Sequence, residues 1–431
     1  AVPSILEIKD YLDSLSREAG AAVGSRVMLA GLEHLDERYL RAVRYTTKSR
    51  RGGLPKLVLI GDIVGDREED VALAASEVVR LANRRAGEGF VAVAADARKR
   101  FWADRSRTAA IARHTNAFKI NEDVVIPLPR LGEYTDGIEH INIELSIGNK
   151  LRLVDELRWL LEADWTLGKI DEGTSDHVEE LVAERRREAL ALVDAVGGRW
   201  RFLLERMDEP LAGLVDALAD HGLAEARDGA LALLAEEPDA TLFRLLQDRT
   251  IRVSWKRELR DGLRRILSGQ TFEPTLAAVE ATHARILRSR VFVALHMHAG
   301  DGNVHTNIPV NSDDYGMLKE AEAAVVRIMA LARSLDGVIS GEHGIGLTKL
   351  AFLDESELEP FRQYKERVDP EGRFNGGKLL AGADLRNAYT PSFGLMGAES
   401  LILQASEIGA IADSIRNCLR CGKCKPVCAT H

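Results

Sequence analysis

Hydrophobic and polar positions alternate along the first third of the chain in blocks that predict strands and helices in turn. A strand is predicted over residues 56–64, and an amphipathic helix with one apolar side over 67–85. An apolar run predicts a second strand over 89–95, followed by a helix over 97–114 and a strand over 117–127. The order of these blocks is typical of a βαβ-like opening.

A second set of strand and helix patterns occupies the last third. An apolar run over 291–295 and a returning run over 304–310 flank a Gly-Asp-Gly-Asn turn, which predicts a β-hairpin. A helix is expected over 313–335, with a strand over 337–340. Strands and helices mixed with hairpins favour the α+β class, here a ferredoxin-like antiparallel sheet with helices on one face.

Residues 146–285, between these two regions, are helical in pattern almost throughout, with breaks at Gly and Pro positions. Apolar stripes at helical spacing usually form a core. We therefore interpret this region as an inserted helical bundle that packs or binds a partner and carries no chemistry.

Composition narrows the class of protein. The 431 residues allow two or three domains, and the net charge of −9 argues against general nucleic-acid binding, because phosphate groups require a basic surface. No apolar stretch approaches the roughly 18 residues of a membrane helix, and no signal-like segment opens the chain. We therefore expect no membrane-spanning segment. The expected location is the cytoplasm, where the protein could also bind peripherally to the inner face of a membrane. Because the chain begins without Met, we also expect it to be a piece of a longer polypeptide.

The predicted hairpin carries candidate metal ligands. His298 and His305 can face each other across its mouth, and Asn307 lies two positions beyond His305, on the same face of the strand. Glu342 can add a carboxylate from a separate loop between glycines. Two imidazoles, a carboxylate and an amide oxygen suit a divalent metal, Zn²⁺ or Mn²⁺, with one position open for substrate. The alternative is that these histidines are polar residues at a turn and a strand end, with no ligand.

All four cysteines lie in the last fourteen residues, at positions Cys418, Cys421, Cys424 and Cys428. This spacing matches the bacterial ferredoxin run, in which three thiolates bind one 4Fe-4S cluster and the fourth binds a second cluster. Ala429 stands where that run usually has Pro. A zinc site or a redox thiol group is the alternative. If Cys428 serves a second cluster, the other ligands of that cluster lie beyond His431.

Three strings together resemble the C-terminal half of the FAD-linked oxidases. They are HAGDGNVHTN at 298–307, SGEHGIG at 340–346 and DPEGRFNGGK at 369–378. The resemblance is to flavoenzymes of the D-lactate dehydrogenase, D-2-hydroxyglutarate dehydrogenase and glycolate oxidase type, and it covers roughly residues 25–145 and 285–380. Gly376 departs from the family, which usually has Pro there.

The resemblance implies an FAD-linked 2-hydroxy-acid dehydrogenase or oxidase. His298, His305 and Glu342 would bind the metal, and His343 would be the catalytic general base, the alternative being a residue that fixes the loop. The small 2-hydroxy-acid substrate is expected to be bound by Asn307, Arg105 and Lys119. Without the resemblance, Arg105 and Lys119 would be interpreted as ordinary surface charges. FAD would be bound mainly by a domain that precedes this segment, because no Gly-x-Gly-x-x-Gly fingerprint follows a strand here.

These expectations divide the chain into four parts. Residues 1–145 and 286–385 are the two parts of an FAD-linked oxidase C-terminal domain, 146–285 is the helical insertion, and 386–431 are a linker and the start of a 4Fe-4S ferredoxin-type domain. Electrons would pass from substrate to flavin, to the clusters and to a quinone or protein acceptor. The alternatives are a metal-containing binding or scaffold subunit without redox activity, and a metal-dependent hydrolase built on the two histidines and Glu342.

Overall fold

The structure is a computed structural model that describes residues 2–19, 27–42, 45, 53–85, 87–105, 117–170, 177–311, 314–346, 349–374 and 379. The backbone divides into two compact units. One comprises Ala1–Ile138 and Val293–His431, and the other comprises Glu139–Phe292. The expected insertion at 146–285 lies inside the second unit, and the four-part division of the chain stays a prediction.

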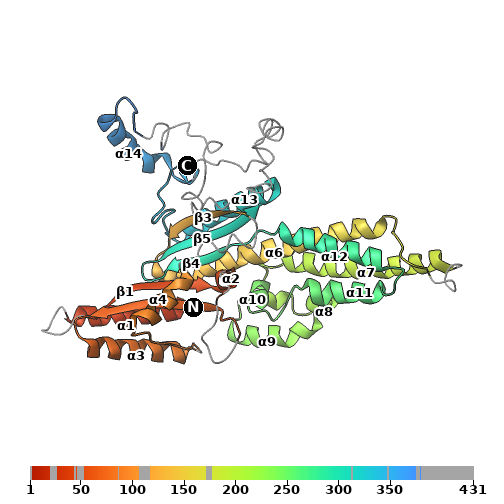
Figure 1. Cartoon of the computed structure of the whole chain (residues 1–431), viewed down its shortest axis with the longest axis horizontal. Coiled ribbons are helices and arrows are strands. Elements are labelled where there is room, and N and C mark those ends of the chain that lie inside the picture. The colour runs from red at the N-terminus through yellow and green to blue at the C-terminus, as the bar shows by residue number, and fades with distance from the viewer. Residues whose placement is uncertain are drawn as a thin grey trace. The chain divides into compact units, whose positions relative to one another are not determined.

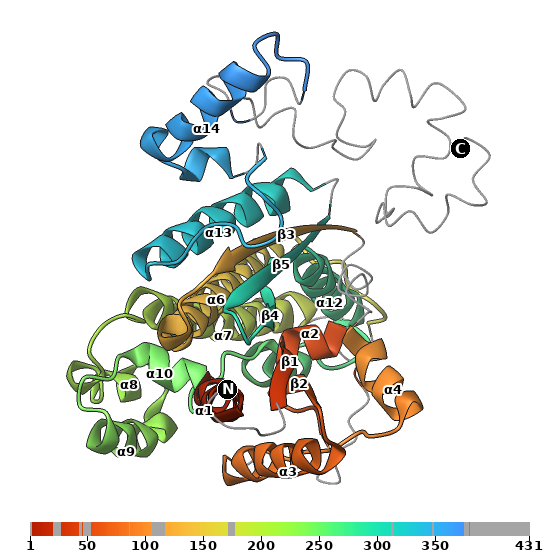
Figure 2. The same cartoon turned by 90° about the vertical axis from the view of Figure 1, so that its left-hand side faces the viewer.

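The first unit is built on a five-stranded antiparallel sheet in the order β2-β1-β4-β5-β3 (Figure 1 and Figure 2). The strands are β1 (Val27–Asp36), β2 (Leu57–Gly65), β3 (Ala117–Val125), β4 (Ala294–His298) and β5 (Asn303–Asn311). The pair β4–β5, from the last third of the chain, therefore lies between β1 and β3, from the first third. The predicted α+β class with an antiparallel sheet and helices is confirmed.

Helices α1 (Val2–Ala19) and α3 (Glu68–Arg84) pack on the β1–β2 end of the sheet and on each other. Apolar residues of both helices form a core with Val27 and Leu29 of β1 and with Leu59 and Ile63 of β2. Because side chains alternate along a strand, these residues define one covered face of the sheet. Helix α13 (Tyr315–Ser334) packs against β3 and β5 (Figure 2).

Four further helices belong to this unit or begin in it: α2 (Glu37–Ala42), α4 (Ala95–Arg105), α14 (Glu355–Val368) and the start of α6 (Leu131–Glu162). Short 3-10 turns lie at Leu128–Arg130 and Leu350–Phe352. Helix α14 begins with a capping box, in which Asp354 and Glu357 exchange side-chain and backbone hydrogen bonds.

The second unit is helical. Its elements are the rest of α6, α7 (Val178–Glu205), α8 (Ala217–Asp220), α9 (Arg227–Glu236), α10 (Leu242–Gln247), α11 (Asp261–Ile266) and α12 (Glu273–Arg288), with a π-helical turn at Trp255–Arg260 and 3-10 turns at Leu211–Gly213 and Ala224–Ala226. Trp200 is fully buried at its core, among leucine and valine side chains. The periodicity that predicted helices here is confirmed.

Several local predictions need correction. The strand expected over 89–95 is wrong, because residues 87–93 have no regular structure and α4 begins at Ala95. The βαβ-like opening is also wrong, because its second strand is absent and β2 pairs antiparallel with β1 instead. Near 337–340 the structure has only an isolated bridge from Val338 to Val125. Helix α1 and strand β1 were not predicted at all.

Among the described residues, no helix combines the length and the apolar character that crossing a bilayer requires.

Candidate metal centre

The predicted hairpin is present and brings its histidines together. Strand β4 pairs with β5 so that His296 lies opposite His305, and His298 lies opposite Asn303. Gly302 in the connecting turn has a positive φ of 78°, and a Cβ atom there would overlap the carbonyl oxygen of Ile126. A glycine is therefore required at this position for both conformation and space.

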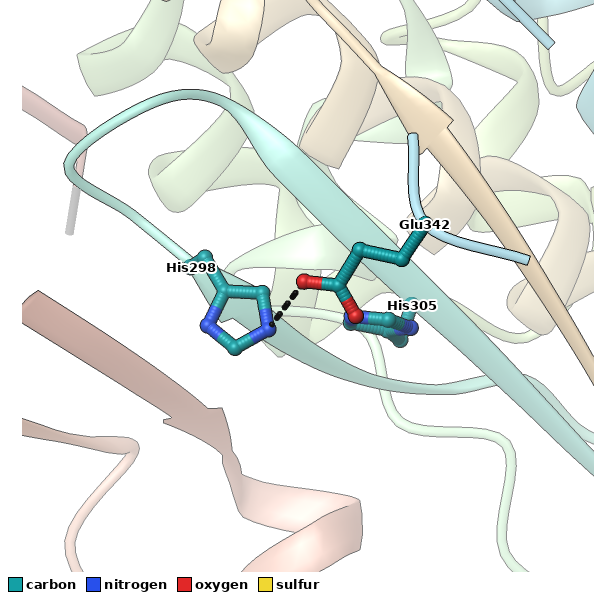
Figure 3. A group of neighbouring side chains, drawn as sticks. All are labelled: His298, His305 and Glu342. Atoms are coloured by element: carbon teal, nitrogen blue, oxygen red, sulfur yellow. Dashed lines mark ion pairs between the residues drawn. The ribbon is translucent and has the colours of Figure 1, made fainter. Parts of the chain in front are cut away.

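Three side chains converge on one point in front of the hairpin (Figure 3). Each of His298, His305 and Glu342 offers one ligand atom, and these atoms all lie within 4.8 Å of one another. The carboxylate of Glu342 has one oxygen 2.9 Å from Nε2 of His298 and the other 3.7 Å from Nε2 of His305. Two imidazole nitrogens and a carboxylate at this separation match the donor set of a divalent metal with open positions.

His305 has the environment of an available ligand. It is buried, and neither of its ring nitrogens has a hydrogen-bond partner among the described residues. Burial lowers its pKa from about 6.5 to about 4, only partly offset by the nearby carboxylate of Glu342. The ring is therefore neutral near pH 7, the form that binds metals. A buried, unpaired nitrogen is costly, and a metal ion at this point would satisfy it.

Glu33 on β1 orients the other imidazole. One of its carboxylate oxygens lies 2.6 Å from Nδ1 of His298, so Nδ1 carries the proton and Nε2 is turned toward Glu342. Glu33 lies opposite His298 in the β1–β4 pairing, and it follows a β-bulge, because the β1–β2 register shifts between Leu29 and Gly31. This bulge moves the next side chains by one position, which places Glu33 on the face opposite the α1–α3 core. Glu33 was not predicted from the sequence, where its one available signal is a charged residue inside a mostly apolar run.

His296 and Asn307 line the same face beside His305. The rings of His296 and His305 are stacked, with centroids 4.4 Å apart. The amide Nδ2 of Asn307 lies 3.0 Å from Nδ1 of His296 and donates to the carbonyl oxygen of Ala294. These contacts fix the amide, and its Oδ1 atom is buried without a partner among the described residues. Asn307 thus presents a free acceptor next to the histidines, and His296 was not singled out from the sequence.

His343 also reaches this cluster. Its ring centroid lies 5.2 Å from that of His305, and its Nδ1 lies 3.5 Å from Oδ1 of Asp123 on β3. The two glycines after it, Gly344 and Gly346, have positive φ angles of 73° and 55°. They allow the tight course of the loop that carries both Glu342 and His343. The site face therefore holds the proposed ligands and the proposed base together.

The other predicted site residues are not placed with this cluster. Arg105 is the last residue of α4, and Lys119 lies on β3 opposite Pro309, but the side chains of both are outside the described residues. The cysteines Cys418, Cys421, Cys424 and Cys428, the expected linker at 386–431 and Gly376 are outside them as well. Their roles remain predictions.

Comparison with known proteins identifies the family. Residues 10–146 and 273–379, more than half of the chain, match the family described as FAD linked oxidases, C-terminal domain. The glycolate oxidase subunit GlcD of Escherichia coli K12 is 39% identical over 92 residues, which are 20% of this chain and 18% of that protein. The D-lactate dehydrogenase of Archaeoglobus fulgidus is 44% identical over 86 residues, 19% of each chain. A probable mitochondrial D-lactate dehydrogenase of Danio rerio is 32% identical over 103 residues, 23% of this chain and 21% of that one.

These alignments span only about a fifth of each relative, whereas the family match covers both sequence segments of the sheet unit and leaves out most of the helical unit. The hairpin, the Glu342 loop and the sheet that unites them all fall inside the matched ranges. On this sequence match, together with the α+β fold, the chain belongs to the family of FAD-linked oxidases with this C-terminal domain.

Proposed function

We propose that this chain is the substrate-binding part of an FAD- and iron–sulfur-dependent oxidoreductase that oxidises a small 2-hydroxy acid. D-lactate, D-2-hydroxyglutarate and glycolate represent the substrate class. The names of the relatives, D-lactate dehydrogenase and glycolate oxidase, support this class. The observation that carries the proposal is the convergence of His298, His305 and Glu342, with a buried His305 nitrogen that has no hydrogen-bond partner in the part of the chain that the structure describes.

The proposed site binds Zn²⁺ or Mn²⁺ through His298, His305 and Glu342. A bound divalent cation would supply positive charge to the hydroxyl oxygen of the substrate as that oxygen loses its proton. The chain contributes the geometry: Glu33 holds His298 in one tautomer, and burial keeps His305 neutral. Glu342, whose side chain is half-exposed, completes the set of three ligands.

Oxidation of a 2-hydroxy acid to the keto acid removes a hydride from carbon and a proton from the hydroxyl group. FAD, when bound, is the two-electron acceptor for the hydride. In our proposal Nε2 of His343 accepts the hydroxyl proton, because its Nδ1 faces the carboxylate of Asp123 and leaves Nε2 for the substrate. The free Oδ1 of Asn307 can accept a hydrogen bond from substrate, and Arg105 and Lys119 are proposed to bind its carboxylate.

The electrons are proposed to leave through iron–sulfur clusters. Cys418, Cys421 and Cys424 would bind one 4Fe-4S cluster, and Cys428 would contribute to a second. A quinone or another protein would be the final acceptor. The ferredoxin-type spacing of the four thiols supports this part of the proposal.

Metal binding can be tested on this chain. Equilibrium dialysis against Mn²⁺, which cysteine thiolates bind less readily than Zn²⁺, should give one bound ion. His305→Ala should reduce occupancy strongly, because it removes the buried ligand. His177→Ala, at an exposed histidine of the helical unit, is the matched control and should bind as the wild type does. Equal metal binding by all three proteins would refute the proposed site.

Activity is tested on the full-length protein supplied with FAD. Turnover of one of the three hydroxy acids, lost in His343→Gln with metal content preserved, is the expected result. Metal binding without turnover of any hydroxy acid would contradict the redox function and favour a metal-containing binding subunit.

A further inference from the structure

Asp123 lies directly behind the loop that carries Glu342 and His343. It is fully buried on β3, opposite His305 in the register with β5. One carboxylate oxygen, Oδ2, accepts three consecutive backbone N–H groups: that of Gly341 at 2.7 Å, that of Glu342 at 2.5 Å and that of His343 at 3.3 Å. Successive N–H groups that converge on one anion form a nest, an arrangement that fixes the backbone of the loop.

Lys349 holds this carboxylate from the other side. Its ammonium group donates to Oδ1 of Asp123 at 2.5 Å and to the backbone oxygen of the same residue at 2.8 Å. Lys349 is itself buried, and its second carboxylate neighbour is Glu122 at 3.6 Å. Burial by itself would raise the pKa of Asp123, but the hydrogen bonds from Lys349 and the loop N–H groups lower it below its usual range. Asp123 is therefore an anion held in a fixed place.

The position of the loop follows from this pair. With the backbone of 341–343 bound to Asp123, the side chain of Glu342 extends over the hairpin toward His298 and His305, as Figure 3 shows. The imidazole of His343 lies beside the ring of His305, with its Nδ1 3.5 Å from the second oxygen of Asp123. One buried carboxylate thus touches both loop residues of the proposed site without being within the group that could bind the metal.

We propose that Asp123, held by Lys349, is the positioning residue of the candidate metal centre. It sets the place of the carboxylate ligand through the backbone of Glu342 and the direction of the His343 ring through Nδ1. The inference rests on the proposed metal site. Its consequence is that metal affinity and metal geometry depend on two residues that never touch the ion.

Two variants test this dependence. Asp123→Asn removes the negative charge. The asparagine amide has one oxygen, whereas the loop N–H groups and Lys349 each donate to a different oxygen of Asp123. The double variant Asp123→Asn with Lys349→Met also removes the ammonium, so that no buried cation faces the neutral amide. Glu122 loses its lysine neighbour in this variant, and burial, which already raises the pKa of Glu122, then favours its neutral form. The matched control is Asp369→Asn: Asp369 likewise accepts two backbone N–H groups, from Arg373 and Phe374, and pairs with a lysine, but it lies outside the cluster.

Affinity for Zn²⁺ and Mn²⁺ is measured by competition with a chromogenic chelator. Thermal unfolding without metal reports the fold, and the visible absorption of bound Co²⁺ reports coordination geometry. Each folded Asp123 variant should bind metal about 10- to 100-fold more weakly and show an altered Co²⁺ spectrum. Asp369→Asn should retain wild-type affinity even where its stability falls.

The outcomes separate the two proposals. Wild-type affinity and spectrum in the folded double variant would overturn the positioning role while leaving the metal site in place. A wild-type chain that binds no metal would overturn the proposed site and the inference together. Equal weakening in Asp369→Asn would show that metal affinity follows general stability, which would also overturn the inference.

Discussion

Replacing Glu33 by Gln removes one negative charge from behind the metal ligand His298 while keeping the shape of the side chain. In the structure the Glu33 carboxylate lies 2.6 Å from Nδ1 of His298, and the side chain is about 10% exposed. The amide oxygen of glutamine can still accept a hydrogen bond from the Nδ1–H group of His298, so the tautomer is preserved. The change therefore isolates the contribution of the charge.

The size of the effect follows from the strength of the hydrogen bond. A bond to a charged group contributes about 1.5–3 kcal/mol, whereas a neutral bond contributes about 0.5–1.5 kcal/mol. The difference of about 1–1.5 kcal/mol corresponds to roughly a tenfold weaker metal affinity. Glu33→Ala also leaves Nδ1 without this partner, so its loss should approach the upper end of the 10- to 100-fold range for groups that orient ligands.

The assay is chelator competition with Zn²⁺ and Mn²⁺, with unfolding curves to show that the variants are folded. Glu37→Gln is the control, because Glu37 is a carboxylate on the adjoining helix α2 that pairs with Arg41 and Lys56. Affinity should fall in the order wild type and Glu37→Gln, then Glu33→Gln, then Glu33→Ala. If Glu33→Ala bound metal as tightly as the wild type, Glu33 would not orient a ligand, and the proposed geometry would be refuted.

Three stability predictions follow from other parts of the chain. Gly302→Ala should lower the free energy of unfolding by more than about 1–2 kcal/mol, because it combines a left-handed conformation with an overlap onto a backbone carbonyl. Gly300→Ala in the same turn is the control, since its Cβ atom meets no atom closer than 3.9 Å, and equal unfolding midpoints of the two variants would contradict this account. Burial lowers the pKa of His34 to about 4, so the unfolded chain takes up the proton first as pH falls below about 6.5, and the fold loses about 3 kcal/mol by pH 4. His34→Leu should remove that part of the loss in urea titrations across this range, and an unchanged slope would refute it. In the helical unit, Trp200→Ala should cost about 3–5 kcal/mol at a fully buried site, and Trp159→Ala, 71% exposed, under about 0.5 kcal/mol; similar costs in calorimetry would be inconsistent with this core.

The local sequence pattern predicted an element correctly where the residues that form its hydrogen bonds lie close together in the chain. The hairpin predicted over 291–310 is present as β4 and β5, because both strands and the glycine turn lie within a few residues of one another. Helix α13, expected over 313–335, is present at Tyr315–Ser334 for the same reason. The predicted strand over 89–95 shows the opposite case. Its apolar side chains Val91 and Val93 are exposed, and no strand within the described ranges pairs with this segment, since β propensity forms a strand only where pairing is available.

The sequence alone determined the proposed ligands on the hairpin and the glycine-flanked loop, because the residue types and the turn between them are local. It also determined the helical character of the inserted region. The fold alone decided that Glu33 would meet His298, 265 residues away, and that Lys349 would meet Asp123, 226 residues away. The first contact depends on the pairing of β1 with β4, and the second on the packing of Lys349, which lies after the Glu342 loop, against β3. Periodicity in one strand specifies which of its residues share a face, but only the assembled sheet specifies which residues of other segments contact that face.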